Sequence, residues 1–253
     1  MTCRIAEHSR THRAPLLLAL MLAGAPALAA DCATRILTAF DADAKAGPGW
    51  AHVPLSKLKR DTVYSTAQEN GSVILKATAE GAASAYVHLA PIDPARLPVI
   101  EWRWRTDALI GAADNRNPKL EDAPVRVIVG FDGDKTRLPE QEQRRFNRAK
   151  TLSGRDLPYA TLMYIWENRA PVGTVIPSTH TAQLKMIVAE SGPQGVGAWR
   201  TYQRNLVQDY QRAFGTAPGR ILGVAVMTDT DNTDSKAEGF YGEIRFTCAS
   251  AAK

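Results

Sequence analysis

Short stretches of the chain alternate apolar and polar residues with a period of two. Val125, Val127 and Val129 fall on one side of such a stretch, and Arg126 falls on the other. Successive side chains of a β-strand point to opposite faces, so this pattern is typical of strands with one buried face. Gly, Pro, Asn and Asp residues, which favour turns, separate the stretches. The pattern predicts strands over 35–40, 62–66, 72–78, 84–90, 99–106, 125–131, 159–167, 182–190, 199–204, 220–228 and 240–247.

The alternation also assigns faces within the last predicted strand. There Phe240, Gly242, Ile244 and Phe246 share one face, so Tyr241 is expected on the opposite face.

Two segments have the pattern of surface helices instead. The segment 139–152 has Pro139 in its first turn, acidic residues early and basic residues late, which complements the helix dipole. Its apolar side is narrow and consists of Phe146, Ala149 and Leu152. The segment 205–214 has a broader apolar stripe and ends before Gly215.

Many short strands with few helices are typical of a sandwich rather than of alternating βα units. The sequence therefore predicts a mainly β protein. We expect a two-sheet antiparallel β-sandwich of the jelly-roll kind, with two short surface helices. Neither an internal repeat nor a linker divides it, so we expect one domain over 30–253.

The N-terminal region has the composition of a signal peptide. Basic residues at 4, 10 and 13 precede an apolar run over 14–30, which ends in the small-x-small pattern of 27–29. A run this short falls below the roughly 20 residues that a transmembrane helix needs. A retained membrane anchor is the alternative. We expect residues 1–29 to be removed on export, no transmembrane segment to remain, and the mature protein to be periplasmic or secreted.

Export would leave two cysteines, Cys32 and Cys248, at opposite ends of the mature chain. Two cysteines in an oxidising compartment usually pair. A disulfide between them would close nearly the whole domain and would stabilise it by about 4–5 kcal/mol in the chain-entropy account. It requires the first and last ordered segments to lie side by side. Two free thiols are the alternative.

Composition and charge narrow the possible partners. The chain is 45% hydrophobic and 23% charged, which is typical of a globular protein. Its 31 Lys and Arg residues exceed its 26 Asp and Glu residues by a formal charge of only +5. Because this excess is small and dispersed, nucleic acid is not an expected partner.

Several motifs together resemble a known family of exported bacterial proteins. The motifs are Trp102-Arg103-Trp104-Arg105, the segment 122–127, the segment 157–166, the run 228–233 and the segment 240–244. In this order they resemble the domain-of-unknown-function family number three thousand and forty-seven. That family implies an exported protein and supplies no catalytic residues.

A broader resemblance is to jelly-roll carbohydrate-binding modules. It rests on the segments 40–50, 71–75 and 241–244. Gly242 and Glu243 stand where those modules usually have an Asp-Asn pair, so their calcium site is not carried over.

Oxygen-bearing side chains gather directly after the predicted strand 220–228. Asp229, Asp231 and Asn232 are closely spaced, and side chains that offer only oxygen ligands suit a hard cation such as calcium. The spacing is not that of an EF-hand, because Phe240 stands at the twelfth position. Two alternatives stay open: a ligand-binding loop without a cation, and turn chemistry in which these side chains cap backbone groups.

Other residues suit the binding of a sugar, which offers apolar faces to aromatic rings and hydroxyls to polar groups. Trp199, beside two glycines, is the first candidate, with packing on the helix over 205–214 as its alternative. Trp166 and Tyr241 are further candidates, although aromatic residues at this spacing are more often core. Asp122 and Arg126 are the polar candidates. Their alternative use is structural, with Asp122 paired to Arg105 or to Arg126.

Signatures of catalysis are absent from the sequence. It contains no HExxH, nucleophile elbow or Gly-rich phosphate loop, and we assign no catalytic residue. We expect an exported protein that binds a glycan or a similar polar ligand without transforming it, near 229–233. One alternative is a polysaccharide-acting enzyme that uses Asp122, Glu167 or Asp229 as acid and base. Another is an envelope protein that presents the basic helix to a partner.

Overall fold

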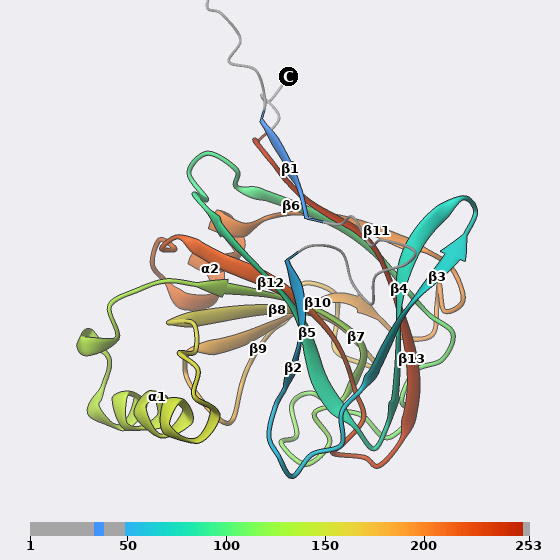
Figure 1. Ribbon diagram of the computed structural model, residues 1–253, viewed down its shortest axis with the longest axis horizontal. Coiled ribbons are helices and arrows are strands. Elements are labelled where there is room, and N and C mark those ends of the chain that lie inside the picture. The colour runs from blue at the N-terminus through green and yellow to red at the C-terminus, as the bar shows by residue number, and fades with distance from the viewer. Residues whose placement is uncertain (1–32, 38–48, 250–253) are drawn as a thin grey trace, which may run out of the picture. The chain divides into compact units, whose positions relative to one another are not determined.

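The computed structural model describes residues 33–37 and 49–249 (Figure 1). The chain divides into two units, Met1–Asp31 and Cys32–Lys253, and only the second contains described residues. The described strands form one sheet of six strands and one of seven, with two α-helices beside them. The predicted mainly β, two-sheet sandwich with two short helices is therefore confirmed. The predicted signal peptide over 1–29 lies outside the described residues.

The six-stranded sheet, sheet A, has the order β11–β6–β13–β4–β3, and β1 pairs with the C-terminal end of β13. All of its pairs are antiparallel. Its strands are β1 (Thr34–Ile36), β3 (Val63–Glu69), β4 (Ser72–Glu80), β6 (Val99–Thr106), β11 (Arg200–Asn205) and β13 (Lys236–Thr247).

The seven-stranded sheet, sheet B, has the order β2–β5–β12–β7–β8–β10–β9. Its pairs are antiparallel except β8 with β10, which run parallel. Parallel neighbours need a crossover connection, and here the chain passes through β9 before it enters β10. The strands are β2 (Trp50–Pro54), β5 (Ala83–Ile92), β7 (Ala123–Phe131), β8 (Ala160–Glu167), β9 (Val175–Pro177), β10 (Leu184–Ser191) and β12 (Ile221–Asp229).

Each predicted strand overlaps an observed one, whereas β2 and β9 were not predicted. Both lie at the edges of sheet B. β9 has only three residues, and most side chains of β2 are exposed, so neither segment shows an alternating apolar pattern. Of the predicted strand 35–40, residues 38–40 lie outside the described residues.

The predicted faces of β13 are wrong in its first half. The register with β6 shifts between Tyr241 and Ile244, which marks a β-bulge at Gly242 and Glu243. A bulge adds a residue to one strand and reverses the alternation beyond it. As a result Tyr241 joins Ile244 and Phe246 in the core.

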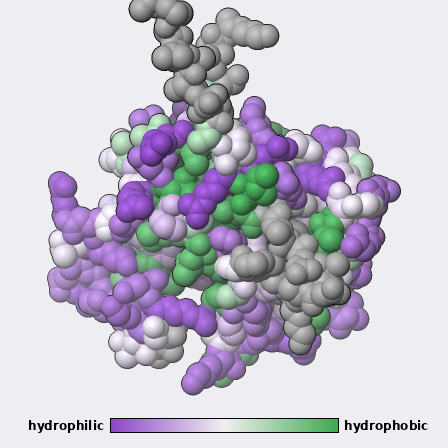
Figure 2. All heavy atoms as spheres, turned by 45° about the horizontal axis from the view of Figure 1, so that its top comes forward, coloured by the Kyte–Doolittle hydropathy of each residue, from purple (hydrophilic) through white to green (hydrophobic). Residues whose placement is uncertain are grey.

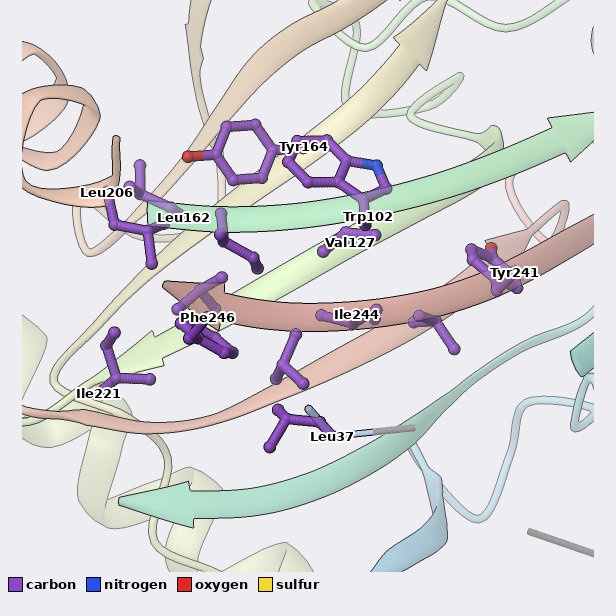
Figure 3. Packing of buried hydrophobic residues seen from close by; sticks show 14 of the residues in the cluster. Leu37, Trp102, Val127, Leu162, Tyr164, Leu206, Ile221, Tyr241, Ile244 and Phe246 are labelled. Atoms are coloured by element: carbon purple, nitrogen blue, oxygen red, sulfur yellow. The ribbon is translucent and has the colours of Figure 1, made fainter. Parts of the chain in front are cut away.

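The core lies between the two sheets and is built largely from aromatic side chains. Trp102 and Trp104 of β6 are 1% and 0% exposed. Trp102 of sheet A meets Tyr164 of sheet B with ring centroids 4.8 Å apart, and Figure 3 shows the two rings side by side. Pairs of aromatic rings at this separation stabilise a core beyond the area that they bury. These contacts join the two sheets.

Both helices form where the sequence predicts them. α1 (Glu140–Ser153) follows a short 3-10 turn, η1 (Lys135–Arg137), and ends at Gly154 with a φ of 69°. α2 (Leu206–Phe214) follows β11 directly, and the Asn205 side chain accepts a hydrogen bond from the Gln208 N–H at its start. Among the described residues, no helix combines the length and apolar character that crossing a bilayer would take.

The first and last described strands of the domain lie side by side. β1 pairs with the end of β13, with Thr34 opposite Thr247. This is the arrangement that a disulfide between Cys32 and Cys248 requires. Cys32 lies outside the described residues, so the bond stays a prediction.

The face shown in Figure 2 is hydrophilic around its margin, and apolar side chains gather near its centre. Ile36 of β1 is 55% exposed, and Leu89 of β5 is 74% exposed. Apolar side chains contribute to the surface of every folded protein, so single residues of this kind need no functional explanation.

Candidate functional site

Three aspartates converge at one end of sheet B. Asp229 is the last residue of β12, and its register partner on β7 is Ala123, the residue after Asp122. Asp231 lies in the turn that follows β12. One carboxylate oxygen from each of Asp122, Asp229 and Asp231 lies within 4.8 Å of the others. We call this group the aspartate cluster.

Asp122 holds the turn after β12 in place. Its Oδ1 accepts a hydrogen bond from the Asn232 N–H at 3.2 Å, and its Oδ2 accepts from the Thr233 N–H at 2.8 Å. The Thr233 hydroxyl donates to the same Oδ2 at 2.6 Å. Asp122 is fully buried, so these bonds satisfy a carboxylate that water does not reach.

Arg126 pairs with Asp229 and not with Asp122. Its Nη2 lies 3.2 Å from Asp229 Oδ2, and the arginine is 1% exposed. The same Nη2 donates to the Glu121 carbonyl at 2.8 Å, and Nη1 points at the Met163 sulfur at 2.9 Å. The expected structural pairing of Asp122 with Arg126 is therefore wrong, because backbone donors of the turn take both oxygens of Asp122.

Arg105, the other partner proposed for Asp122, lies elsewhere. It pairs with Glu69 at 3.5 Å and with Asp107 at 3.3 Å, both on the sheet A side of the molecule. The pairing of Asp122 with Arg105 is therefore wrong as well.

Asp231 is the most exposed of the three members of the aspartate cluster. Its Oδ2 lies 2.5 Å from Lys59 Nζ, and its side chain is 15% exposed. Burial opposes its ionisation, but hydrogen bonds from Asp229 and Lys59 together lower its pKa. Burial raises the pKa of Asp229 well above its ordinary value, an effect that Arg126 opposes and the neighbouring Asp231 and Asp122 reinforce. The cluster is thus arranged to hold one proton, or a cation in its place.

The aspartate cluster differs in one member from the predicted cation ligands Asp229, Asp231 and Asn232. Asn232 donates its side-chain amide to the Pro118 carbonyl at 3.0 Å. Asp122 supplies the third carboxylate. Sequence spacing does not reveal this exchange, because Asp122 precedes Asp229 by more than a hundred residues.

Trp166 and Tyr241, two of the predicted sugar-binding residues, lie in the core. They are 0% and 1% exposed. The Trp166 indole donates to the Gly192 carbonyl at 2.9 Å, and the Tyr241 hydroxyl donates to the Met227 carbonyl at 2.6 Å. Both side chains are satisfied within the fold and offer no surface to a ligand.

Trp199 lies on the outer face of sheet A, half-buried. The guanidinium carbon of Arg103 is 4.8 Å from the centroid of its ring, and that of Arg105 is 5.7 Å away. The indole N–H donates to Glu69 at 3.0 Å. Trp199 therefore contacts charged side chains of the sheet. Its role in sugar binding stays a prediction.

A pocket of about 580 Å³ lies between α1 and sheet B. Phe146 and Ala149 of α1 line one side, and Thr161 of β8 and Leu184 of β10 line another. Its remaining lining residues are Glu142, Arg145, Leu157, Pro158, Thr179, His180, Thr181 and Gln183.

The five predicted sugar-binding residues are therefore not brought together. Trp199 lies on sheet A, Trp166 and Tyr241 lie in the core, and Asp122 and Arg126 lie in and beside the aspartate cluster.

Sequence reasoning missed the pocket beside α1. The signal that could have found it is the narrow apolar side of that helix, since Phe146 and Ala149 face the pocket rather than a dry core.

No curated protein matches the chain. Among solved structures, endoglucanase 3 from family GH12 of Trichoderma harzianum is 8% identical, with a TM-score of 0.43 over 86% of this chain and 97% of that chain. The family 11 xylanase from Neocallimastix patriciarum is 9% identical, with a TM-score of 0.32 over 85% and 92%. Likenesses this distant carry no conclusion about activity. The family described as "Protein of unknown function (DUF3047)" matches residues 48–245, so the chain belongs to this family.

Proposed function

We propose that this protein is exported and binds a glycan, or a ligand of similar polarity, without transforming it. The observation that carries the proposal is the pocket between α1 and sheet B. The N-terminal pattern of basic, apolar and small residues supports export to the periplasm or beyond.

The size and lining of the pocket suit a sugar. Its volume of about 580 Å³ falls within the range of roughly 300–1,000 Å³ that is typical of small-molecule sites. Phe146 offers an apolar ring, against which the apolar face of a sugar can pack. Thr161, Gln183 and His180 place hydroxyl, amide and imidazole groups around it, as hydrogen-bond partners for sugar hydroxyls.

The charges in the pocket favour a neutral ligand. Glu142 is 8% exposed, and its Oε2 accepts a hydrogen bond from the Thr181 hydroxyl at 2.6 Å. Arg145 Nη1 lies 3.8 Å from Glu142 Oε1. Because the negative charge of Glu142 and the positive charge of Arg145 lie in the same wall, they largely cancel. We therefore expect a neutral glycan rather than an anionic one.

Native affinity electrophoresis tests the proposal. The mature protein is run through gels that contain neutral or acidic polysaccharides, and we expect a neutral polymer to slow it. Phe146→Ala should abolish the retardation. Gln183→Ala should weaken binding by up to about tenfold, the contribution of one hydrogen bond. Asn147→Ala, the exposed neighbour of Phe146 on α1, is the matched control and should behave as wild type.

Circular dichroism and thermal unfolding of each variant show whether the fold is intact. Failure of every polymer to slow the protein would overturn the proposal. So would unchanged retardation of the Phe146→Ala protein. Retardation that is lost in Trp199→Ala but kept in Phe146→Ala would instead move the site to the outer face of sheet A.

The same samples decide between binding and cleavage. Asp122, Glu167 and Asp229, the candidate acid and base residues, are between 0% and 7% exposed. A polymer cannot reach carboxylates at this depth, and this supports binding without hydrolysis. New reducing ends that disappear in Asp229→Asn would replace our proposal by an enzymatic function.

A further inference from the structure

With all three aspartates ionised, the aspartate cluster holds more negative charge than its neighbours compensate. Its three carboxylates face two cationic side chains, Arg126 and Lys59. Asp122 and Asp229 are 0% and 7% exposed, so water screens this excess poorly. A buried charge without a partner is costly, and a proton or a further cation removes that cost.

One oxygen of Asp229 has no donor. Asp229 Oδ2 pairs with Arg126, whereas Oδ1 is buried and accepts no hydrogen bond from the described residues. Glu121 Oε2 and Glu167 Oε1 likewise accept no hydrogen bond from this part of the chain, and Asp229 differs from them in having two further carboxylates beside it. The hydrogen bond between Asp229 and Asp231 needs one of the two to be protonated, so when both are ionised Oδ1 has no donor. This oxygen therefore points to a ligand that the cluster takes up.

We propose that Asp122, Asp229 and Asp231 form a calcium site, and that Lys59 competes with the ion for Asp231. Asp229 Oδ1 offers a free oxygen. Asp122 Oδ1 keeps a second lone pair beside the single hydrogen bond that it accepts from the Asn232 N–H. Lys59 Nζ sits 2.5 Å from Asp231, where the ammonium takes the place of the cation, and its side chain is 39% exposed. A lysine on a flexible stem at the surface can leave when calcium enters.

The dimensions of the cluster fit calcium. Calcium binds oxygen at about 2.3–2.6 Å, so two ligands on opposite sides of the ion lie roughly 4.6–5.2 Å apart. The three oxygens of the cluster lie within 4.8 Å of one another. Calcium also takes water molecules among its six to eight ligands, and the partly exposed side of Asp231 provides access for them.

The competition with Lys59 gives a test that a folding defect cannot mimic. Protein freed of metal with a chelator is titrated with calcium chloride by calorimetry, and its thermal unfolding is followed with calcium or with chelator. We expect wild type to bind a single calcium ion and to unfold at a higher temperature with calcium. Lys59→Met removes the competing charge and should tighten binding by about tenfold or more. Lys57→Met, an exposed lysine of the same loop, should leave the affinity unchanged.

A second pair of variants tests the ligands themselves. Asp231→Asn should weaken binding by about tenfold or more, because a neutral amide replaces a charged ligand. Asp234→Asn makes the same change at an exposed position of the same turn and should bind as wild type. The proposal is overturned if neither wild type nor Lys59→Met responds to calcium, if Lys59→Met binds no more tightly, or if Asp231→Asn and Asp234→Asn bind alike. None of these readouts involves a glycan, so the outcome is independent of the proposed function.

Discussion

Asp209 should contribute a large part of the stability of this domain. It lies in the first turn of α2, is 5% exposed, and forms a two-point ion pair with Arg204 of β11. Arg204 Nε and Nη2 lie 2.8 Å and 2.6 Å from its two oxygens. The hydroxyl of Tyr164 on sheet B also donates to Asp209 Oδ2 at 2.8 Å. One carboxylate thus joins α2, sheet A and sheet B.

Asp209→Asn removes the charge and keeps the shape of the side chain. Loss of one partner from a buried ion pair costs about 3–5 kcal/mol. The Arg204 side chain is 29% exposed and can turn toward water, so we expect a loss near the lower limit, about 3 kcal/mol. Tyr164→Phe removes a single hydrogen bond to the same carboxylate and should cost about 1.5–3 kcal/mol.

Urea unfolding followed by tryptophan fluorescence measures these losses. Asp156→Asn is the matched control, because Asp156 pairs with Lys150 at 2.8 Å at the exposed surface. Ion pairs at the exposed surface contribute little to stability, so this variant should unfold nearly as wild type does. The reasoning is refuted if Asp209→Asn costs less than about 1 kcal/mol, or no more than Asp156→Asn.

Three further predictions concern the ends of the chain, its tyrosines and its close contacts. In the mature protein, an alkylating reagent should modify Cys32 and Cys248 only after the disulfide is reduced. Reduction should lower the free energy of unfolding by about 4–5 kcal/mol. Modification without a reductant would contradict the disulfide. Burial raises the pKa of most tyrosines, among them Tyr164, Tyr241 and Tyr210, the last to about 12. Because the folded state holds these protons more tightly, stability should be complete below about pH 10 and should fall as the pH rises through the folded values. Tyrosinate absorbance should then appear together with the loss of circular dichroism, whereas titration of most tyrosines in the folded protein near pH 10 would contradict their burial. Gly223→Ala would place Cβ 2.4 Å from the His88 carbonyl oxygen, a backbone atom that cannot move aside, and should cost about 2–3 kcal/mol in urea unfolding. At Gly242 the three atoms nearest to an added Cβ all belong to the side chain of Arg103, which can shift, so Gly242→Ala should cost less, and equal losses would contradict this explanation.

Local pattern accounts for most of the secondary structure. The strand over 99–106 was predicted with the bounds that β6 has, and the helix over 205–214 differs from α2 by one residue. Both depend on residues close together in the chain, such as the alternation of Trp102 and Trp104 and the cap at Asn205. Signals of this kind can be recognised in the sequence without knowledge of the tertiary structure.

The same local reasoning fails where distant segments meet. The β-bulge at Gly242 reverses the faces of β13, because the register depends on the partner strand β6. Arg126 pairs with Asp229 rather than with Asp122, since the turn after β12 supplies closer donors to Asp122. The parallel pair of β8 and β10 likewise follows from the path of the chain through β9.

The class of fold, most segments that become strands and helices, and the acidic run after β12 follow from local sequence pattern. Three features depend on how the segments pack: Asp122 completes the aspartate cluster, Trp166 and Tyr241 are core residues, and a pocket lies beside α1. The reason is physical. Strand and helix formation depend on the period of side chains along one segment, whereas a site depends on which segments the sheets place next to one another.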